Sequence, residues 1–243
     1  MHPVFLNPTI SAALDRIAER AADVRRAFVP GAIPRYDDVA SASPHSEFTL
    51  DPLSVALAPD TYVACRTPDG KTAYTRDGQF TIDGDRLCTA DGLPVLGFAR
   101  PNRGLGELCV DPVDATLGRV ADLRVASDGT LSYTRSAIDP RSGRSERQRV
   151  AVGRIAVARF PAATVLPAID AKTYAAPDGV TPHLGMPADG GLPPLESMRR
   201  QHSGVALDES LARLKAAYVA FDALTAAETA SGRFKKTVMD LVK

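Results

Sequence analysis

The chain is poor in the residue types that usually mark a chemical site. Its 243 residues include no tryptophan, three cysteines and four histidines, and only 6% of them are aromatic. The cysteines (Cys65, Cys88 and Cys109) show neither a disulfide framework nor the paired spacing of a zinc site, so we expect small buried hydrophobes. The histidines lie far apart along the chain, and we expect no metal site.

An excess of charge of either sign is also missing. The chain has 29 basic and 29 acidic residues, which gives a formal net charge of zero. Such a balance creates no overall field for nucleic acid or an anionic membrane, so neither is expected as a partner. No run approaches the roughly 18 apolar residues of a membrane span, and residues 1–7 lack the features of a Sec signal. We therefore expect a soluble protein without a Sec leader.

Patterns typical of catalysis or nucleotide binding are missing as well. Residues 70–72, Gly-Lys-Thr, resemble the end of a phosphate loop, but the first glycine of that motif would fall at Cys65. No Gly-x-Ser-x-Gly elbow occurs, and the aspartates do not fit the spacing of a calcium loop. We expect no catalytic residue and no cofactor.

The middle of the chain reads as a succession of short strands. Apolar and β-branched runs between residues 48 and 174 are separated by Asp-Gly pairs, at Asp69, Asp77, Asp83, Asp91 and Asp128. The glycine of such a pair can supply the positive φ that a tight hairpin turn requires. No helix-length periodic segment interrupts the region, so parallel βαβ units are not expected. We predict an antiparallel β-rich core domain over residues 48–174.

Both ends of the chain carry the apolar spacing of an amphipathic helix. The repeating positions are Ile10, Leu14, Ile17, Ala21 and Val24 within residues 1–30, and Leu207, Leu211, Leu214, Tyr218 and Phe221 within residues 205–243. A narrow apolar seam is not satisfied by a single helix in water. The helices therefore pair with each other as a coiled-coil-like element, pair with neighbouring subunits, or pack on the β domain.

Three further segments complete the predicted organisation. Residues 31–47 and 175–204 are rich in proline, with serine or glycine, and are predicted to be extended connectors. The stretch Arg135–Arg149 holds several arginines against Asp139 and Glu146, and we predict a long solvated hairpin loop. Such a loop could also dock an acidic partner or a polyanion.

A series of motif positions runs through the central domain. It comprises Tyr74, Thr75, Arg76, Asp77, Gly78, Phe80, Gly92, Pro94 and Gly97, followed by an Asp-Gly turn at Asp128 and a long strand at 152–160. In this order and spacing the positions resemble the signature of the bacterial flagellar basal-body rod and hook family. Residues 201–207 are similar to the family's entry into its C-terminal helix. Residues 19–23 depart from the asparagine-rich helix of the family.

The resemblance implies a structural subunit of the flagellar basal-body rod, of proximal or distal type. It implies export through the flagellar type III apparatus, which agrees with the expected absence of a Sec signal, and a place in the rod that crosses the periplasm. Expected partners are copies of the chain and other flagellar rod, hook or ring subunits. The terminal helices would stack into an inner tube that transmits torque, so the apolar seam positions given above form the expected assembly interface.

The alternative is a soluble β-rich binding module that recognises a cell-envelope glycan or an acidic protein partner through Arg135–Arg149. Such a module would act with residues 48–174 alone, whereas a rod subunit would need its helices. An enzyme would require a deep pocket with converging ionisable groups.

Overall fold

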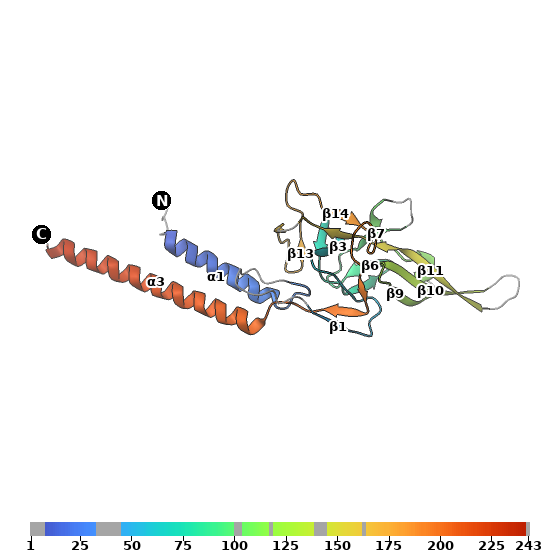
Figure 1. Ribbon diagram of the computed structural model, residues 1–243, viewed down its shortest axis with the longest axis horizontal. Helices are drawn as coiled ribbons and strands as arrows, with labels where there is room; N and C mark the ends of the chain where they lie inside the picture. The colour runs from blue at the N-terminus through green and yellow to red at the C-terminus, as the bar shows by residue number, and fades with distance from the viewer. Residues whose placement is uncertain are drawn as a thin grey trace. The chain divides into compact units, whose positions relative to one another are not determined.

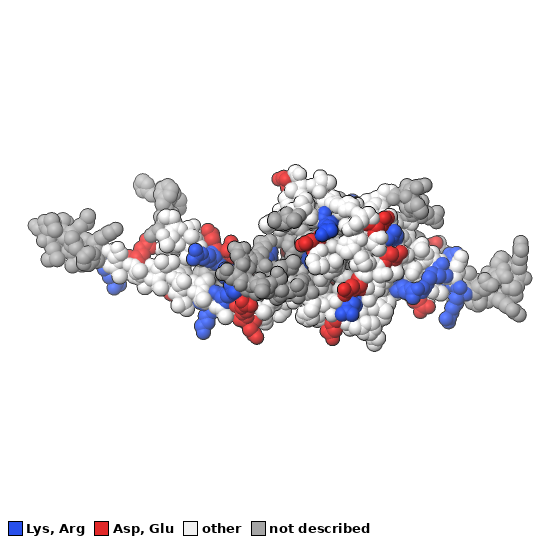
Figure 2. All heavy atoms as spheres, viewed as in Figure 1, with Lys and Arg blue, Asp and Glu red and all other residues white. Residues whose placement is uncertain are grey.

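The computed structural model of the chain describes residues 8–32, 45–99, 104–116, 119–138, 145–161 and 164–241. The chain divides into two compact units. A helical unit takes in residues 1–28, 33–43 and 203–243, and a β-rich unit takes in residues 29–32 and 44–202. Most of the predicted connector 31–47 therefore lies outside the described residues, which resume at His45. Charged side chains of both signs lie on the face seen in Figure 2.

The helical unit consists of α1 (Pro8–Arg26) and α3 (Leu207–Leu241), which lie side by side and run antiparallel (Figure 1). Proline is favoured in the first turn of a helix because its missing N–H has no intrahelical acceptor there, and α1 begins at Pro8. The first turn of α3 contains Asp208 and Glu209, whose negative charge suits the helix N-terminus. Among the described helices, none combines the length and the apolar character needed to cross a membrane.

The β-rich unit contains two five-stranded sheets, and every strand pairing in them is antiparallel. The first sheet has the order β8-β7-β11-β10-β9, formed by β7 (Leu96–Phe98), β8 (Gly106–Glu107), β9 (Val120–Val125), β10 (Thr130–Ile138) and β11 (Ser145–Ile155). The second has the order β13-β4-β3-β12-β14, formed by β3 (Thr61–Arg66), β4 (Thr72–Thr75), β12 (Val157–Arg159), β13 (Thr173–Tyr174) and β14 (His183–Gly185).

Three two-stranded ladders accompany these sheets. They pair β1 (Ser46–Phe48) with β16 (Arg199–Gln201), β2 (Val55–Ala56) with β15 (Glu196–Ser197), and β5 (Phe80–Asp83) with β6 (Arg86–Thr89). A short helix, α2 (Pro112–Thr116), precedes β9. The predicted antiparallel β-rich core with a helix at each end of the chain is thus confirmed.

The two large sheets meet at Ala156, the residue between β11 and β12. Its N–H donates to the Leu96 carbonyl at 2.9 Å, and its own carbonyl accepts the Ala64 N–H at 3.0 Å. Apolar residues then alternate between two clusters: Val63, Val95, Ile155 and Val157 belong to one, and Ala64, Leu96, Ala156 and Ala158 belong to the other. Successive side chains of a strand point to opposite faces, so the junction is buried on both faces.

Two predicted segments differ from the structure. Residues 175–204, expected to be an extended connector, supply β14, β15 and β16, and Leu192 and Leu195 are core residues. The predicted loop Arg135–Arg149 is mostly strand, because β10 and β11 continue to Ile138 and from Ser145, and only residues 139–144 lie outside the described residues. Of the cysteines expected to be buried, Cys65 and Cys88 are buried but Cys109 is exposed.

Candidate functional site

The motif segment Tyr74–Phe80 carries the chain from the end of β4 into β5. Its side chains are almost entirely enclosed: Thr75 and Asp77 are each 1% exposed, and Arg76 and Phe80 are each 4% exposed. Phe80 packs in the main core cluster, and Tyr74 makes an edge-to-face contact with Phe160 in the second cluster. The segment therefore presents little chemistry to solvent.

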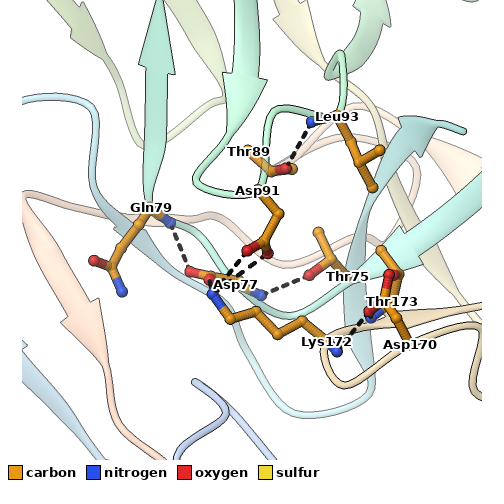
Figure 3. A network of polar contacts seen from close by, with 9 residues as sticks. All are labelled: Thr75, Asp77, Gln79, Thr89, Asp91, Leu93, Asp170, Lys172 and Thr173. Atoms are coloured by element: carbon orange, nitrogen blue, oxygen red, sulfur yellow. Dashed lines mark hydrogen bonds and ion pairs between the residues drawn. The ribbon is translucent and has the colours of Figure 1, made fainter. Parts of the chain in front are cut away.

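Asp77 lies at the centre of a polar network (Figure 3). Its backbone N–H donates to Thr75 Oγ1 at 3.0 Å, and its Oδ1 accepts the Gln79 N–H at 3.1 Å. Its Oδ2 accepts a hydrogen bond from Lys172 Nζ at 3.0 Å. An aspartate side chain that bonds the backbone two residues ahead stabilises a tight change of chain direction. The Asp77 carboxylate thus stabilises the turn of the backbone within the motif and also binds the distant Lys172.

Lys172 bridges two aspartates and is itself held by a third. Its Nζ lies 3.3 Å from Asp91 Oδ2, next to the contact with Asp77. Asp170 Oδ1 accepts the N–H groups of both Lys172 and Thr173 at 2.8 Å (Figure 3). Burial opposes the charge of Lys172, yet the hydrogen bond and charge of Asp77, together with Asp91, raise the pKa of the lysine overall. Burial likewise opposes ionisation of Asp170, but the bonds from Thr173 and Lys172 lower its pKa overall.

Arg76 is buried in a different manner. Its Nε, Nη1 and Nη2 have no hydrogen-bond partner within the described parts of the chain, and its Cζ lies 5.6 Å from the centre of the Tyr62 ring. Burial lowers the pKa of Arg76, while Tyr62 and Asp60 act in the opposite direction. A Cβ at Gly31 would lie 2.8 Å from Arg76 Nε, so the Gly31 turn passes directly against the guanidinium.

The motif glycines have separate structural roles. Gly78 is needed for close approach, because a Cβ there would lie 2.0 Å from the Val55 carbonyl oxygen; Gly97 is similar, at 2.4 Å from the Arg154 carbonyl oxygen. Gly92 has a φ of 81° in the turn before Pro94, and its N–H donates to the Thr89 carbonyl at 2.9 Å. Gly78 was expected to supply a positive φ and does not, since the glycines with positive φ do not include it.

The predicted seam positions of the helices separate into two sets. Ile17 is buried in the helical unit, and the half-buried members are Ile10, Ala21, Val24, Leu207, Leu214 and Phe221. Leu14, Leu211 and Tyr218 are instead 40%, 46% and 51% exposed. Ala13 and Ser210, which we did not predict, are buried in α1 and α3. A heptad pattern marks the apolar positions of a helix but not which of them face an intramolecular neighbour.

Several residues that complete the site carried no sequence signal. Lys172 is an isolated lysine whose partner Asp77 is distant in the sequence. The Gln201 side chain bonds the backbone of Leu57 on both sides. Its amide nitrogen donates to the Leu57 carbonyl at 3.1 Å, and its amide oxygen accepts the Leu57 N–H. Asp114 in α2 accepts the Tyr133 hydroxyl at 2.7 Å. The contacts between these residues depend on the fold and could not be predicted from the sequence.

The motif region contains ion pairs between its own residues and packed aromatic rings, and no reactive group is identified among its described residues. Within the described ranges, no three His, Cys, Asp or Glu side chains are placed to hold a metal ion. The burial of Cys65 raises its pKa to about 12, so its thiol stays protonated near neutral pH. The geometry of the motif is that of a structural joint between β4, β5 and the segment before β13.

Comparison with known proteins agrees with this structural character. Residues 56–133 match the family model described as the flagellar hook protein FlgE/F/G D1 domain. The chain is 34% identical over 86 residues to the flagellar basal-body rod protein FlgF of Escherichia coli (strain K12), and 29% identical over 86 residues to FlgF of Salmonella typhimurium (strain LT2). Each match covers 35% of this chain and 29% of the relative, so less than a third of the length of either relative is spanned. Over this central region, the chain is therefore similar to proteins of the flagellar basal-body rod and hook.

Proposed function

We propose that the chain is a structural subunit of the flagellar basal-body rod that assembles through its terminal helices and performs no catalysis. The observation that carries the proposal is that three predicted seam side chains on α1 and α3, namely Leu14, Leu211 and Tyr218, are exposed. Burial of apolar surface stabilises by about 25 cal/mol per Å², so such side chains favour association with another apolar surface.

The two sets of seam residues suggest two different tasks. Ile17, Leu214 and Phe221 lie at buried or half-buried positions, where α1 and α3 pack on each other within one subunit. Leu211 and Tyr218 lie on an adjacent face of α3 that solvent reaches. On this proposal the first set stabilises the helix pair and the second set contacts neighbouring subunits. Torque would pass between subunits through these apolar contacts, and the β-rich unit would be a rigid body attached to them.

The proposed cellular setting rests on the similarity of the central region to flagellar rod proteins. We propose that the chain lies in the rod that crosses the periplasm, after export through the flagellar type III apparatus without a Sec signal. Copies of the chain and other flagellar rod, hook or ring subunits are its proposed partners. Both relatives are flagellar basal-body rod proteins, which supports this placement.

The test is sedimentation velocity of the full chain over a series of concentrations. Wild-type protein should form larger species as the concentration rises, and Leu211→Asp and Tyr218→Asp should each suppress this growth. Ala216→Asp is the matched control, because Ala216 is exposed on α3 and is not a seam position. Leu214→Asp is expected to abolish assembly while the β-rich unit stays folded, which the near-ultraviolet circular dichroism of its tyrosines would show.

Two results would overturn the proposal. The first is growth of the Tyr218→Asp variant equal to that of the wild type. The second is equal suppression by Ala216→Asp, because loss of assembly would then report a general effect of helix charge and not the apolar seam.

A further inference from the structure

The outer face of the β9–β10–β11 part of the first sheet carries a group of arginines. Directly opposed residues in antiparallel strands point to the same face. Ser132 on β10 is opposed by Arg124 on β9 and by Ala151 on β11, and Thr134 is opposed by Arg149. Arg147 precedes Arg149 by two positions along β11 and therefore shares that face. Between the arginines lie the small side chains of Ser132, Thr134 and Ala151.

The opposite face of the same strands is buried against the core. Leu131 and Tyr133 on β10 are fully buried, and Val125 on β9 is 2% exposed. The arginine face must therefore point away from the core, and Arg124, Arg147 and Arg149 are all exposed. Lys and Arg atoms gather over this part of the sheet (Figure 2).

The ionic contacts of these arginines differ from those of Arg135 on the other face. Within the described parts of the chain, Arg124, Arg147 and Arg149 form no ion pair, whereas Arg135 on the other face pairs with Asp114 at 3.4 Å. Asp122 on β9 is exposed but forms no ion pair among the described residues, and Asp128, which bonds Thr130, lies 4.0 Å from Arg154. In a chain whose net charge is zero, this face concentrates one sign of charge.

A largely apolar pocket continues the same face. It has a volume of about 430 Å³ and is lined by Phe98, Ala99, Thr130, Ala151, Gly153, Arg154 and Met186. Thr130 opposes Arg154, and Arg154 opposes Phe98 on β7, so these residues extend the row that begins with Arg147 and Arg149. Ala151 belongs both to the pocket wall and to the arginine face. Pockets of a few hundred Å³ with apolar walls are typical of sites that enclose a hydrophobic group.

We propose that this face is a docking surface for an acidic, extended segment of a partner protein that inserts one hydrophobic side chain into the pocket. The proposal is independent of the terminal helices and of the rod assembly proposed above, because all of its residues belong to the β-rich unit.

The spacing of the groups specifies the segment. Positions 147, 149 and 151 are alternate residues of β11, so their side chains recur about every 7 Å along the strand. An extended peptide has the same repeat. A hydrophobic residue over Ala151, followed at alternate positions by two carboxylates, would therefore meet the pocket, Arg149 and Arg147 in turn. Arginine suits this task because its planar guanidinium can bind a carboxylate through two parallel hydrogen bonds.

The experiment uses the full chain and a fluorescent peptide that carries one phenylalanine followed at alternate positions by two glutamates. Fluorescence anisotropy should show saturable binding that weakens as salt is raised, since exposed charges are screened. The double variant Arg147→Glu/Arg149→Glu should lower the affinity about tenfold or more, because opposed charges become like charges. Ala151→Leu should lower it several-fold by filling the pocket mouth while the arginines remain.

The matched control is Arg159→Glu, which makes the same change of charge on β12, a strand of the second sheet. It should leave the affinity unchanged, and circular dichroism should be the same for all variants. Equal weakening by Arg159→Glu would overturn the proposal. So would equal binding of polyglutamate without an apolar residue, which would indicate a site for polyanions in general. Concentration-dependent self-association that the double variant abolishes would instead assign the face to a second copy of the chain.

Discussion

The Lys172 ammonium lies 3.0 Å from Asp77 Oδ2, and the Asp77 side chain is only 1% exposed whereas that of Lys172 is 29% exposed. The pair joins the motif after β4 to the segment before β13, and β13 in turn pairs with β4. The acidic motif position Asp77 thus serves packing through one distant lysine. Solvent reaches the ion pair from the lysine side, and this limits the contribution of the pair to the free energy of unfolding.

Lys172→Met tests this pair. Removing one partner of a buried ion pair costs about 3–5 kcal/mol, and removing an exposed pair costs almost nothing. Because Lys172 is partly exposed, we expect the free energy of unfolding in urea to fall by about 1–3 kcal/mol. Lys71→Met is the control, because its ion pair with Asp69 is largely exposed, and it should cause no measurable change. Equal effects of the two variants would show that burial of Asp77 has no energetic consequence.

Gly78→Ala tests the close approach of two chain segments. The added Cβ would lie 2.0 Å from the Val55 carbonyl oxygen, and the Val55 N–H donates to the Gly78 carbonyl at 2.9 Å. Backbone atoms cannot turn aside as a side chain can, so β2 would have to shift and that hydrogen bond would weaken. We expect a loss of about 3 kcal/mol or more, at the upper end of overpacking costs.

The control for Gly78→Ala is Gly104→Ala. Gly104 has no atom within 4 Å of an added Cβ and no positive φ, so its substitution should change the free energy of unfolding by less than about 0.5 kcal/mol. A small loss for Gly78→Ala, close to that of the control, would mean that the two segments are free to separate.

Local chemistry explains which turns could be predicted from the sequence. Gly70, Gly84, Gly92 and Gly129 follow aspartate and have positive φ, as the Asp-Gly pairs predicted. Gly78 follows aspartate too, yet its role is set by Val55 on another strand, which no local pattern reveals. The antiparallel class and the terminal helices were predictable because periodicity over many residues reports which face is buried.

Long-range pairing explains the errors. The strands β15 and β16 are two or three residues long and pair with β2 and β1 near the other end of the β-rich unit. Strands so short carry no readable alternation, and the prolines and glycines of residues 177–194, which precede them, resemble a connector. The same limit applies to the site. The pairing of Lys172 with Asp77 depends on the fold and has no local sequence pattern. The division of the seam into two faces likewise depends on the packing of α1 against one side of α3.

The pH dependence of stability should report the Tyr133–Asp114 hydrogen bond. Burial and the bond to Asp114 raise the pKa of Tyr133 to about 12, whereas an unfolded tyrosine has a pKa of about 10. The folded state therefore keeps a proton that the unfolded state loses. The free energy of unfolding should be unaffected by this group below pH of about 10 and should fall between about 10 and 12.

The same bond acts in the opposite direction at low pH. The hydrogen bond from Tyr133, opposed by burial and helped by Arg135, lowers the pKa of Asp114. Its contribution is present above the unfolded pKa of about 3.9 and should be lost as the pH falls below that value. Urea titrations of Tyr133→Phe should show shallower declines at both ends of the pH range. The control is Tyr218→Phe, because Tyr218 is 51% exposed, and this variant should follow the wild-type profile. A Tyr133→Phe profile that matches the wild type would exclude this bond as a source of pH dependence.

Arg76→Met should stabilise the isolated chain, because the guanidinium is buried without a hydrogen-bond partner among the described residues. Replacing a buried charge by an apolar side chain of similar length is often neutral or stabilising by about 1–4 kcal/mol. The stacking of Arg76 on Tyr62, worth about 0.5–2 kcal/mol, would be lost, so we expect a net gain of about 1 kcal/mol in the free energy of unfolding. Arg66→Met is the matched control and should have the opposite sign, because Arg66 pairs with Glu107 at 3.4 Å and bonds the Gly70 carbonyl at 3.1 Å. If Arg76→Met destabilised the chain as Arg66→Met does, the Arg76 guanidinium would have to be stabilised by a partner, and the prediction would be wrong.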